Sequence, residues 1–214
     1  MQVLVGIAAL LFAGIGNLHY GLPKVKKYFR LAGRQRALWN QPWVIGVVAG
    51  LAVCAAVTLR FGSINLLLMF PVLTLGTVLT VIDAGTQRLP RSMTAAFLVL
   101  VVIAVVLAGF ITGQWVKPAY SLIVALGTFI LLLPGTFVRH GIGVGDLRLA
   151  PLLVGLATCS SWHCLLAMGI FTVVGAGCWA LYLVIWKKAA GSTRFAFGPW
   201  LLVATYFALL LVPR

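Results

Sequence analysis

The chain has 214 residues, of which 63% are hydrophobic and 8% are charged, and its formal net charge is +14. Several apolar runs approach the roughly 20 residues that cross a bilayer as a helix, and a soluble core cannot absorb so many of them. The composition excludes a soluble domain with a solvated nucleic-acid-binding face. It predicts an all-α, polytopic membrane helical bundle formed by one integral-membrane domain, residues 1–214.

Apolar runs separated by charged residues, glycine or proline predict about eight transmembrane segments. In chain order we expect them at 2–20, 43–59, 63–82, 93–113, 119–138, 147–160, 162–186 and 197–213. The first run has neither a basic leading region nor a small-residue cleavage pattern, so we expect it to be retained as a span. The sixth run would cover only about 21 Å as a helix, and a re-entrant half-helix is its alternative.

The orientation follows from the basic residues. The short basic loop 24–41, between the first two segments, belongs in the cytoplasm by the positive-inside rule. If all eight segments cross, thirteen basic residues lie inside and three outside, whereas a sixth segment that turns back gives eleven and five. The eight-span topology is therefore favoured, with the N-terminus and C-terminus outside. Basic residues near anionic headgroups also explain the net charge, so membrane lipids are expected partners and nucleic acid is not.

The cysteines give no indication of a metal site. Cys54, Cys159, Cys164 and Cys178 lie in or beside apolar runs, without Cys-x-x-Cys spacing. Small apolar packing residues are the default interpretation, and a local disulfide between Cys159 and Cys164 stays open. We expect neither a metal nor a cofactor.

Only two acidic side chains occur in the chain, Asp83 and Asp146, and both lie at the edge of an apolar run. The eight-span topology puts both at the cytoplasmic ends of their segments. Ionisable groups at membrane depth are costly and are functional candidates by default. In a partly dry site, one ionised carboxylate can activate water while a protonated neighbour polarises a carbonyl. That pairing hydrolyses peptides without a metal.

The sequence around the two aspartates resembles a known family. Gly143-Val-Gly-Asp146 matches the Gly-x-Gly-Asp motif of the intramembrane aspartyl proteases. Together with Asp83, Leu89-Pro90, Gly141–Leu149 and Phe197-Gly-Pro-Trp200, and with an opening stretch Leu10–Pro23 similar to the family's first span, it resembles the bacterial type IV prepilin peptidases.

This resemblance implies an aspartic endopeptidase of the bacterial cytoplasmic (inner) membrane. It would remove the basic leader from a prepilin or pseudopilin at the cytoplasmic face, with Asp83 and Asp146 as catalytic residues. The residues implied to lie near the site, for substrate binding or for structure, are Gly143, Gly145, Arg148, Leu89 and Pro90. The oligomeric state is left open by the sequence.

The chain departs from the family's pattern in three ways. The loop 24–41 holds no cysteine, whereas many members insert a cysteine-rich, zinc-binding segment there, so N-methyltransferase activity is not expected. The usual Lys two residues after the second Asp is Arg148, and the usual Asn or Asp after Leu-Pro is Arg91. A planar guanidinium is not a simple replacement for lysine. The usual Arg before the first proline is missing at Pro23.

Each interpretation has an alternative. Asp83 could form a structural ion pair with Arg88 or Arg91, and Asp146 with Arg148. The glycines before Asp146 could indicate a dinucleotide loop, but without a strand–helix context they more simply permit close backbone approach. At the level of function, a proton-coupled transporter and a non-catalytic scaffold for pilus or secretion assembly are the alternatives to the peptidase.

The helix ends predict unequal roles for the two carboxyls. Asp83 lies at the C-terminal end of its segment, where the helix dipole disfavours an anion, and Asp146 lies at an N-terminal end, where it favours one by about 0.3–1 kcal/mol. We therefore expect the shared proton mainly on Asp83, with Asp146 as the base. The pair titrates as a unit, so this describes a dominant microstate.

Overall fold

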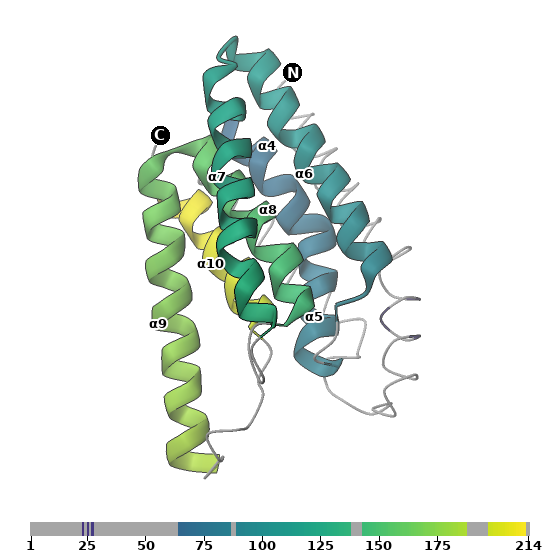
Figure 1. Cartoon of the computed structure of the whole chain (residues 1–214), viewed down its shortest axis with the longest axis vertical. Coiled ribbons are helices and arrows are strands. Elements are labelled where there is room, and N and C mark those ends of the chain that lie inside the picture. Colours follow the sequence, from purple (N-terminus) through teal and green to yellow (C-terminus); the bar gives the residue numbers. More distant parts are fainter. Residues whose placement is uncertain are drawn as a thin grey trace.

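The computed structural model describes residues 64–86, 89–137, 143–187 and 197–212, together with Pro23, Val25 and Lys27. These ranges are helical with short connections (Figure 1). The expected segments 2–20 and 43–59 lie outside the described residues, and so does the loop 24–41 apart from Val25 and Lys27. The six later segments each correspond to a helix, which confirms the all-α class for this part of the chain.

The third expected segment is one long helix with an irregular middle. It consists of α4 (Ile64–Pro71), a π-helical stretch (Val72–Gly76) and α5 (Thr77–Thr86). Pro71 has no backbone N–H, and a wider turn after it reorganises the helical hydrogen bonds. Thr74 and Thr77 donate their hydroxyls to carbonyls of the preceding turn, at 2.8 Å for Thr74 to Phe70 and for Thr77 to Thr74. The helix therefore continues past the π-helical stretch to the end that carries Asp83.

The next two helices form an antiparallel hairpin. Helix α6 (Arg91–Thr112) begins after Pro90 and ends at Gly113. Gly113 has a left-handed φ of 64°, which glycine adopts readily because it has no Cβ. Helix α7 (Val116–Leu132) follows and ends in a 3-10 turn (Leu133–Thr136). A Cβ on Gly109 would lie 3.1 Å from Pro118 and 3.2 Å from Trp115, so this glycine lets the two helices meet closely at their connection.

Helix α8 (Val144–Ser160) is the centre of the bundle and contacts α4, α6, α7, α9 and α10. Its 17 residues would cover about 25 Å, more than the expected segment 147–160 but still less than a bilayer core. Ser121 of α7 donates its hydroxyl to the carbonyl of Gly155 at 2.7 Å, where the glycine admits the neighbouring helix. Figure 1 shows that α9 begins at the end of the bundle opposite the start of α8. Whether α8 crosses the membrane or is re-entrant stays a prediction.

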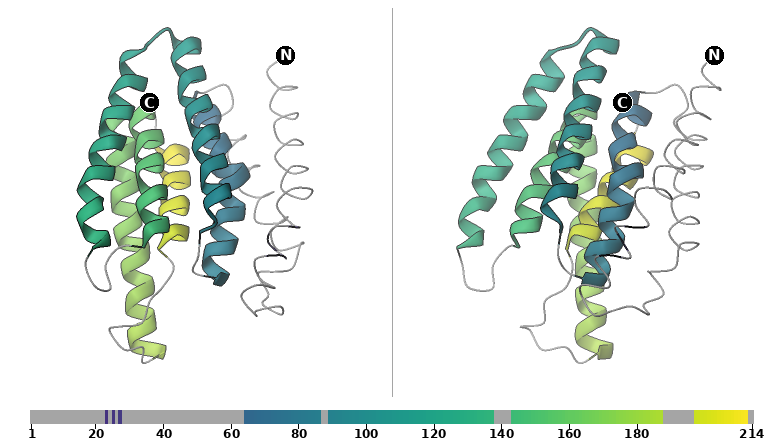
Figure 2. Two further views of the ribbon diagram at one scale, coloured as in Figure 1. Left: turned by 45° about the vertical axis from the view of Figure 1, so that its right-hand side comes forward. Right: turned by 90° about the vertical axis from the view of Figure 1, so that its right-hand side faces the viewer.

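Helix α9 (Trp162–Lys187) and helix α10 (Gly198–Leu211) complete the described part. Figure 2 shows α10 inside the bundle and α9 extending beyond it. Among the described residues, four stretches are long and apolar enough to cross a membrane: Ile64–Ala84, Arg91–Thr112, Val116–Thr136 and Trp162–Ile185. Their outer faces expose large apolar side chains such as Ile103 and Ile170, as lipid contact requires. The total of eight spans and the sides of the termini stay predictions.

A buried polar cluster joins three helices at the end of the bundle away from Asp146. Ser160 of α8 donates its hydroxyl to Oδ1 of Asn65 in α4 at 2.7 Å, and the Asn65 amide donates to the carbonyl of Leu209 in α10 at 3.3 Å. Asn65 and Ser160 are each 1% exposed. Cys159 lies next to this cluster. No disulfide joins it to Cys164, so the local disulfide that the sequence left open does not form in this structure.

Candidate active site

Asp83 is a buried residue near the end of α5, with 5% of its surface exposed. The helix runs three residues beyond it to Thr86, so Asp83 lies within the last turn and not at the final residue. Its carboxyl group lies against the first residue of α10: a Cβ on Gly198 would be 2.6 Å from Oδ2 of Asp83. The backbone N–H of Gly198 points to the same carboxyl. Oδ2 itself makes no hydrogen bond among the described residues.

Asp146 is half-buried in the first turn of α8. The helix begins at Val144, so Asp146 is its third residue and lies among the N–H groups that have no partner within the helix. Its Oδ2 would be 3.4 Å from a Cβ on Gly143, the residue that precedes the helix. A side chain at Gly143 would therefore touch the Asp146 carboxyl.

The two carboxyls come together although 62 residues separate them in the sequence. Figures 1 and 2 show that the end of α5, the start of α8 and the start of α10 share one end of the bundle. Asp146 is close enough to act on the Asp83 carboxyl electrostatically. The structure therefore places both aspartates that the sequence singled out at the same end of the bundle. When both are charged they repel, which favours a shared proton.

Leu89 and Pro90 close the site from the side of α6. A Cβ on Gly145 would lie 2.9 Å from Cδ1 and 3.0 Å from Cβ of Leu89, so the glycine before Asp146 is the place where Leu89 packs. Pro90 is buried and adopts an extended conformation just before α6. Thr94 donates two hydrogen bonds to the carbonyl of Pro90, from its backbone N–H at 3.0 Å and from its hydroxyl at 3.1 Å. The space left by the missing side chain of Gly145 is therefore filled by the side chain of Leu89.

The arginines near the site do not neutralise the aspartates. Neither Asp83 with Arg91 nor Asp146 with Arg148 forms an ion pair among the described residues, and no cation acts on either carboxyl there. Arg88 and Gly141 lie outside the described residues. The structural ion-pair alternative therefore fails for Arg91 and Arg148.

Gly198 is the residue whose role the sequence did not reveal. In the sequence, the stretch Phe197-Gly-Pro-Trp200 resembles an element of the type IV prepilin peptidases, but it predicts no particular contact. The structure shows its role: Gly198 is the first residue of α10, followed by Pro199, and it lets the start of the helix approach Asp83 and Leu149. The Cδ2 atom of Leu149 would be 3.5 Å from a Cβ added to Gly198. A Gly-Pro pair before an apolar run indicates a helix start, but not what the helix start touches.

The contact with α10 also changes the argument about helix dipoles. Asp83 lies at the C-terminal end of α5, as expected, but its carboxyl also faces the N-terminus of α10, whose dipole favours an anion. The two effects oppose each other at Asp83, so helix ends alone do not separate it from Asp146. The shared proton on Asp83 stays a prediction without that support.

Comparison with known protein families gives a match to the model of the type IV leader peptidase family over residues 68–211. The chain belongs to the type IV leader peptidase family. The matched range holds both aspartates, Leu89, Pro90 and Gly198, and it covers nearly all of the described helices. No curated protein and no solved structure matched the chain. Membership and the four apolar helices make this an integral membrane protein and, at the level of the family, a protease of the leader-peptidase type.

In this leader peptidase family member, Asp83, Asp146 and Gly198 lie at one end of the described bundle. The stretch Leu10–Pro23 lies outside the matched range and, apart from Pro23, outside the described residues. Among the described residues, no three His, Cys, Asp or Glu side chains gather as a set of metal ligands. The chemistry that the gathered groups can perform is that of two carboxyls and a backbone N–H.

Proposed function

We propose that this leader peptidase family member is an intramembrane aspartic endopeptidase with Asp83 and Asp146 as its catalytic pair. The observation that supports the proposal best is that the only two acidic residues of the chain lie at the same end of the bundle, where Asp146 acts electrostatically on Asp83. Two carboxyls at the same end of a bundle, with no ion pair to a described arginine, are suited to share one proton. A structural role would instead leave each paired with an arginine.

The reaction follows from that shared proton. The ionised carboxyl takes a proton from a water molecule, whose oxygen bonds to the carbonyl carbon of the scissile peptide, while the protonated carboxyl donates to the carbonyl oxygen. As the tetrahedral intermediate collapses, the carbon–nitrogen bond breaks and the leaving nitrogen receives a proton from one carboxyl. One hydroxyl of the intermediate returns its proton to the other carboxyl and becomes part of the product carboxyl group. The products are a carboxylic acid and a free amine, and the pair again holds one proton.

The substrate class follows from the family. We propose that the chain removes the basic leader of a prepilin or pseudopilin, cutting after glycine where the leader meets an apolar helix, at the cytoplasmic face of the bacterial inner membrane. The charge distribution of the sequence supports this side, because it assigns the ends that carry the two aspartates to the cytoplasm. The cysteine-free loop 24–41 is the reason to propose cleavage without N-methylation.

The test is co-expression of the full chain with each pilin-like precursor of its source genome, with leader loss followed by a gel shift. Asp83→Asn and Asp146→Asn keep the size of the side chain and remove its charge, and each should abolish cleavage. Gly169→Ala, at a position with open space around it, is the matched control for expression and insertion. Full cleavage by either Asn variant would refute the pair, and no cleavage of any precursor by the unmodified chain would favour the scaffold.

A further inference from the structure

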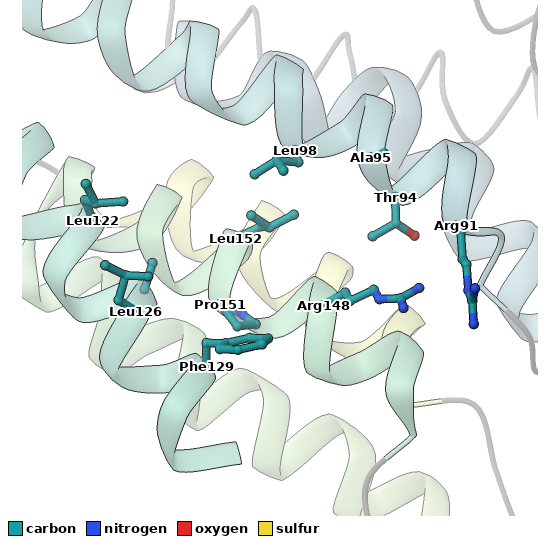
Figure 3. Close-up of a pocket in the computed structure, with 11 residues that line it drawn as sticks. Arg91, Thr94, Ala95, Leu98, Leu122, Leu126, Phe129, Arg148, Pro151 and Leu152 are labelled. Atoms are coloured by element: carbon teal, nitrogen blue, oxygen red, sulfur yellow. The ribbon is translucent and has the colours of Figure 1, made fainter. Parts of the chain in front are cut away.

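A groove of about 470 Å³ opens on the side of the bundle between α6, α7 and α8. Apolar residues make up most of its wall, and four of them are leucines: Leu98, Leu122, Leu126 and Leu152. Figure 3 shows these side chains along the groove and Arg91 and Arg148 together at one of its ends. The distance from Arg91 to Leu98 along α6 is about 10 Å, which is long enough for part of an acyl chain.

The end of the groove is positively charged and has no counter-charge in the protein. Arg91 is the first residue of a helix that is long and apolar enough to cross a membrane. Basic residues at the ends of such helices lie near the lipid headgroups. Arg148 reaches across toward it from α8 (Figure 3). The chain has only two acidic residues, and neither pairs with these arginines. Two cations that face each other at the edge of a bilayer repel unless an anion lies between them.

We propose that this groove binds one anionic phospholipid, with its phosphate between Arg91 and Arg148 and an acyl chain along the leucines. Guanidinium groups bind phosphate oxygens in a bidentate manner, and basic pockets between transmembrane helices bind acidic headgroups. The leader of a precursor is basic and is repelled by the same two arginines. A free phosphate would leave the leucine wall uncovered. The inference does not depend on the peptidase proposal, because lipid retention can be measured without cleavage.

The experiment is native mass spectrometry of the full chain, purified from vesicles of phosphatidylcholine with a minor share of phosphatidylglycerol. The unmodified chain should retain one phosphatidylglycerol in preference to phosphatidylcholine. A basic residue near the membrane surface contributes about 1 kcal/mol to such binding, so Arg91→Gln and Arg148→Gln should each reduce retention about fivefold. Lys117→Gln removes one charge at the other end of the hairpin and should leave retention unchanged.

A second pair of variants tests the apolar part of the groove without altering charge. Ala95 lines the groove, so Ala95→Phe should displace the lipid, whereas Val99→Phe places the same ring on an exposed α6 position that does not line it. Equal retention of both lipids by the unmodified chain, or equal loss in Lys117→Gln, would overturn the proposal. So would an Ala95→Phe chain that keeps its phosphatidylglycerol but loses cleavage, because the groove would then hold the substrate helix.

Discussion

The contact between Gly198 and Asp83 predicts that a single methyl group will impair catalysis. In Gly198→Ala the new Cβ would be 2.6 Å from Oδ2 of Asp83, about 0.8 Å short of an ordinary contact at 3.4 Å. Either the carboxyl or the start of α10 must move by most of that distance. Both movements separate the carboxyl from the N–H of Gly198 and change its position relative to Asp146.

The magnitude follows from how strongly catalysis depends on position. A misplacement of about 1 Å can reduce a rate about 100-fold, so we expect kcat/KM to fall by about that factor, which corresponds to about 2.7 kcal/mol of transition-state stabilisation. The assay is cleavage of the precursor found by co-expression, with purified enzyme in vesicles of constant lipid composition. The stability of the variant in detergent should change little, because Ala is a better helix former than Gly.

Gly169→Ala is the matched control, since it makes the same change in α9, where nothing lies within 4 Å of the added Cβ. It should cleave at the rate of the unmodified chain. If Gly198→Ala also keeps kcat/KM within about twofold, the contact of α10 with Asp83 is not part of the active arrangement, and the reasoning from geometry to rate is wrong.

Two further predictions concern contacts on either side of the site. Gly145→Ala should lower cleavage because its Cβ would lie 2.9 Å from Leu89, and adding Leu89→Ala should restore part of the rate; a double variant no better than the single one would contradict this steric account. Ser160→Ala removes the donor to buried Asn65 and should cost about 1–3 kcal/mol in the free energy of unfolding. Ser160 lies about 21 Å along α8 from Asp146, so cleavage by the variant should be unchanged. Denaturant titrations measure the loss of stability, and activity assays on the same preparations measure cleavage. The exposed Ser92→Ala is its control, and equal stability of the two would refute the buried-bond argument.

The membrane class and the helices could be predicted because their causes are local. Apolar runs such as 93–113 must satisfy their backbone hydrogen bonds within themselves in lipid, so length and composition alone indicate a helix. The boundaries were less accurate. Helix α5 continues beyond Asp83 to Thr86, and α8 begins before Asp146, since a polar residue ends an apolar run without ending a helix.

The candidate pair could also be named from the sequence, because a carboxylate at an apolar boundary is costly wherever the chain folds. Charge counting, which needs only the order of the segments, put both aspartates at the same end. The role of Leu89 was indicated by resemblance only. That it packs against Gly145 depends on how α6 and α8 approach each other, and no local pattern encodes that distance.

The sequence by itself determined that this is an all-helical membrane protein with two acidic residues at hydrophobic boundaries, because burial of apolar and charged groups acts on each segment separately. Only the tertiary structure decided that α8 lies at the centre, that Asp83 faces the start of α10, and that Arg91 and Arg148 leave the aspartates unpaired. These contacts join side chains that are far apart in the sequence. They depend on how closely the helices pack, which glycines such as Gly198 permit by leaving space between them.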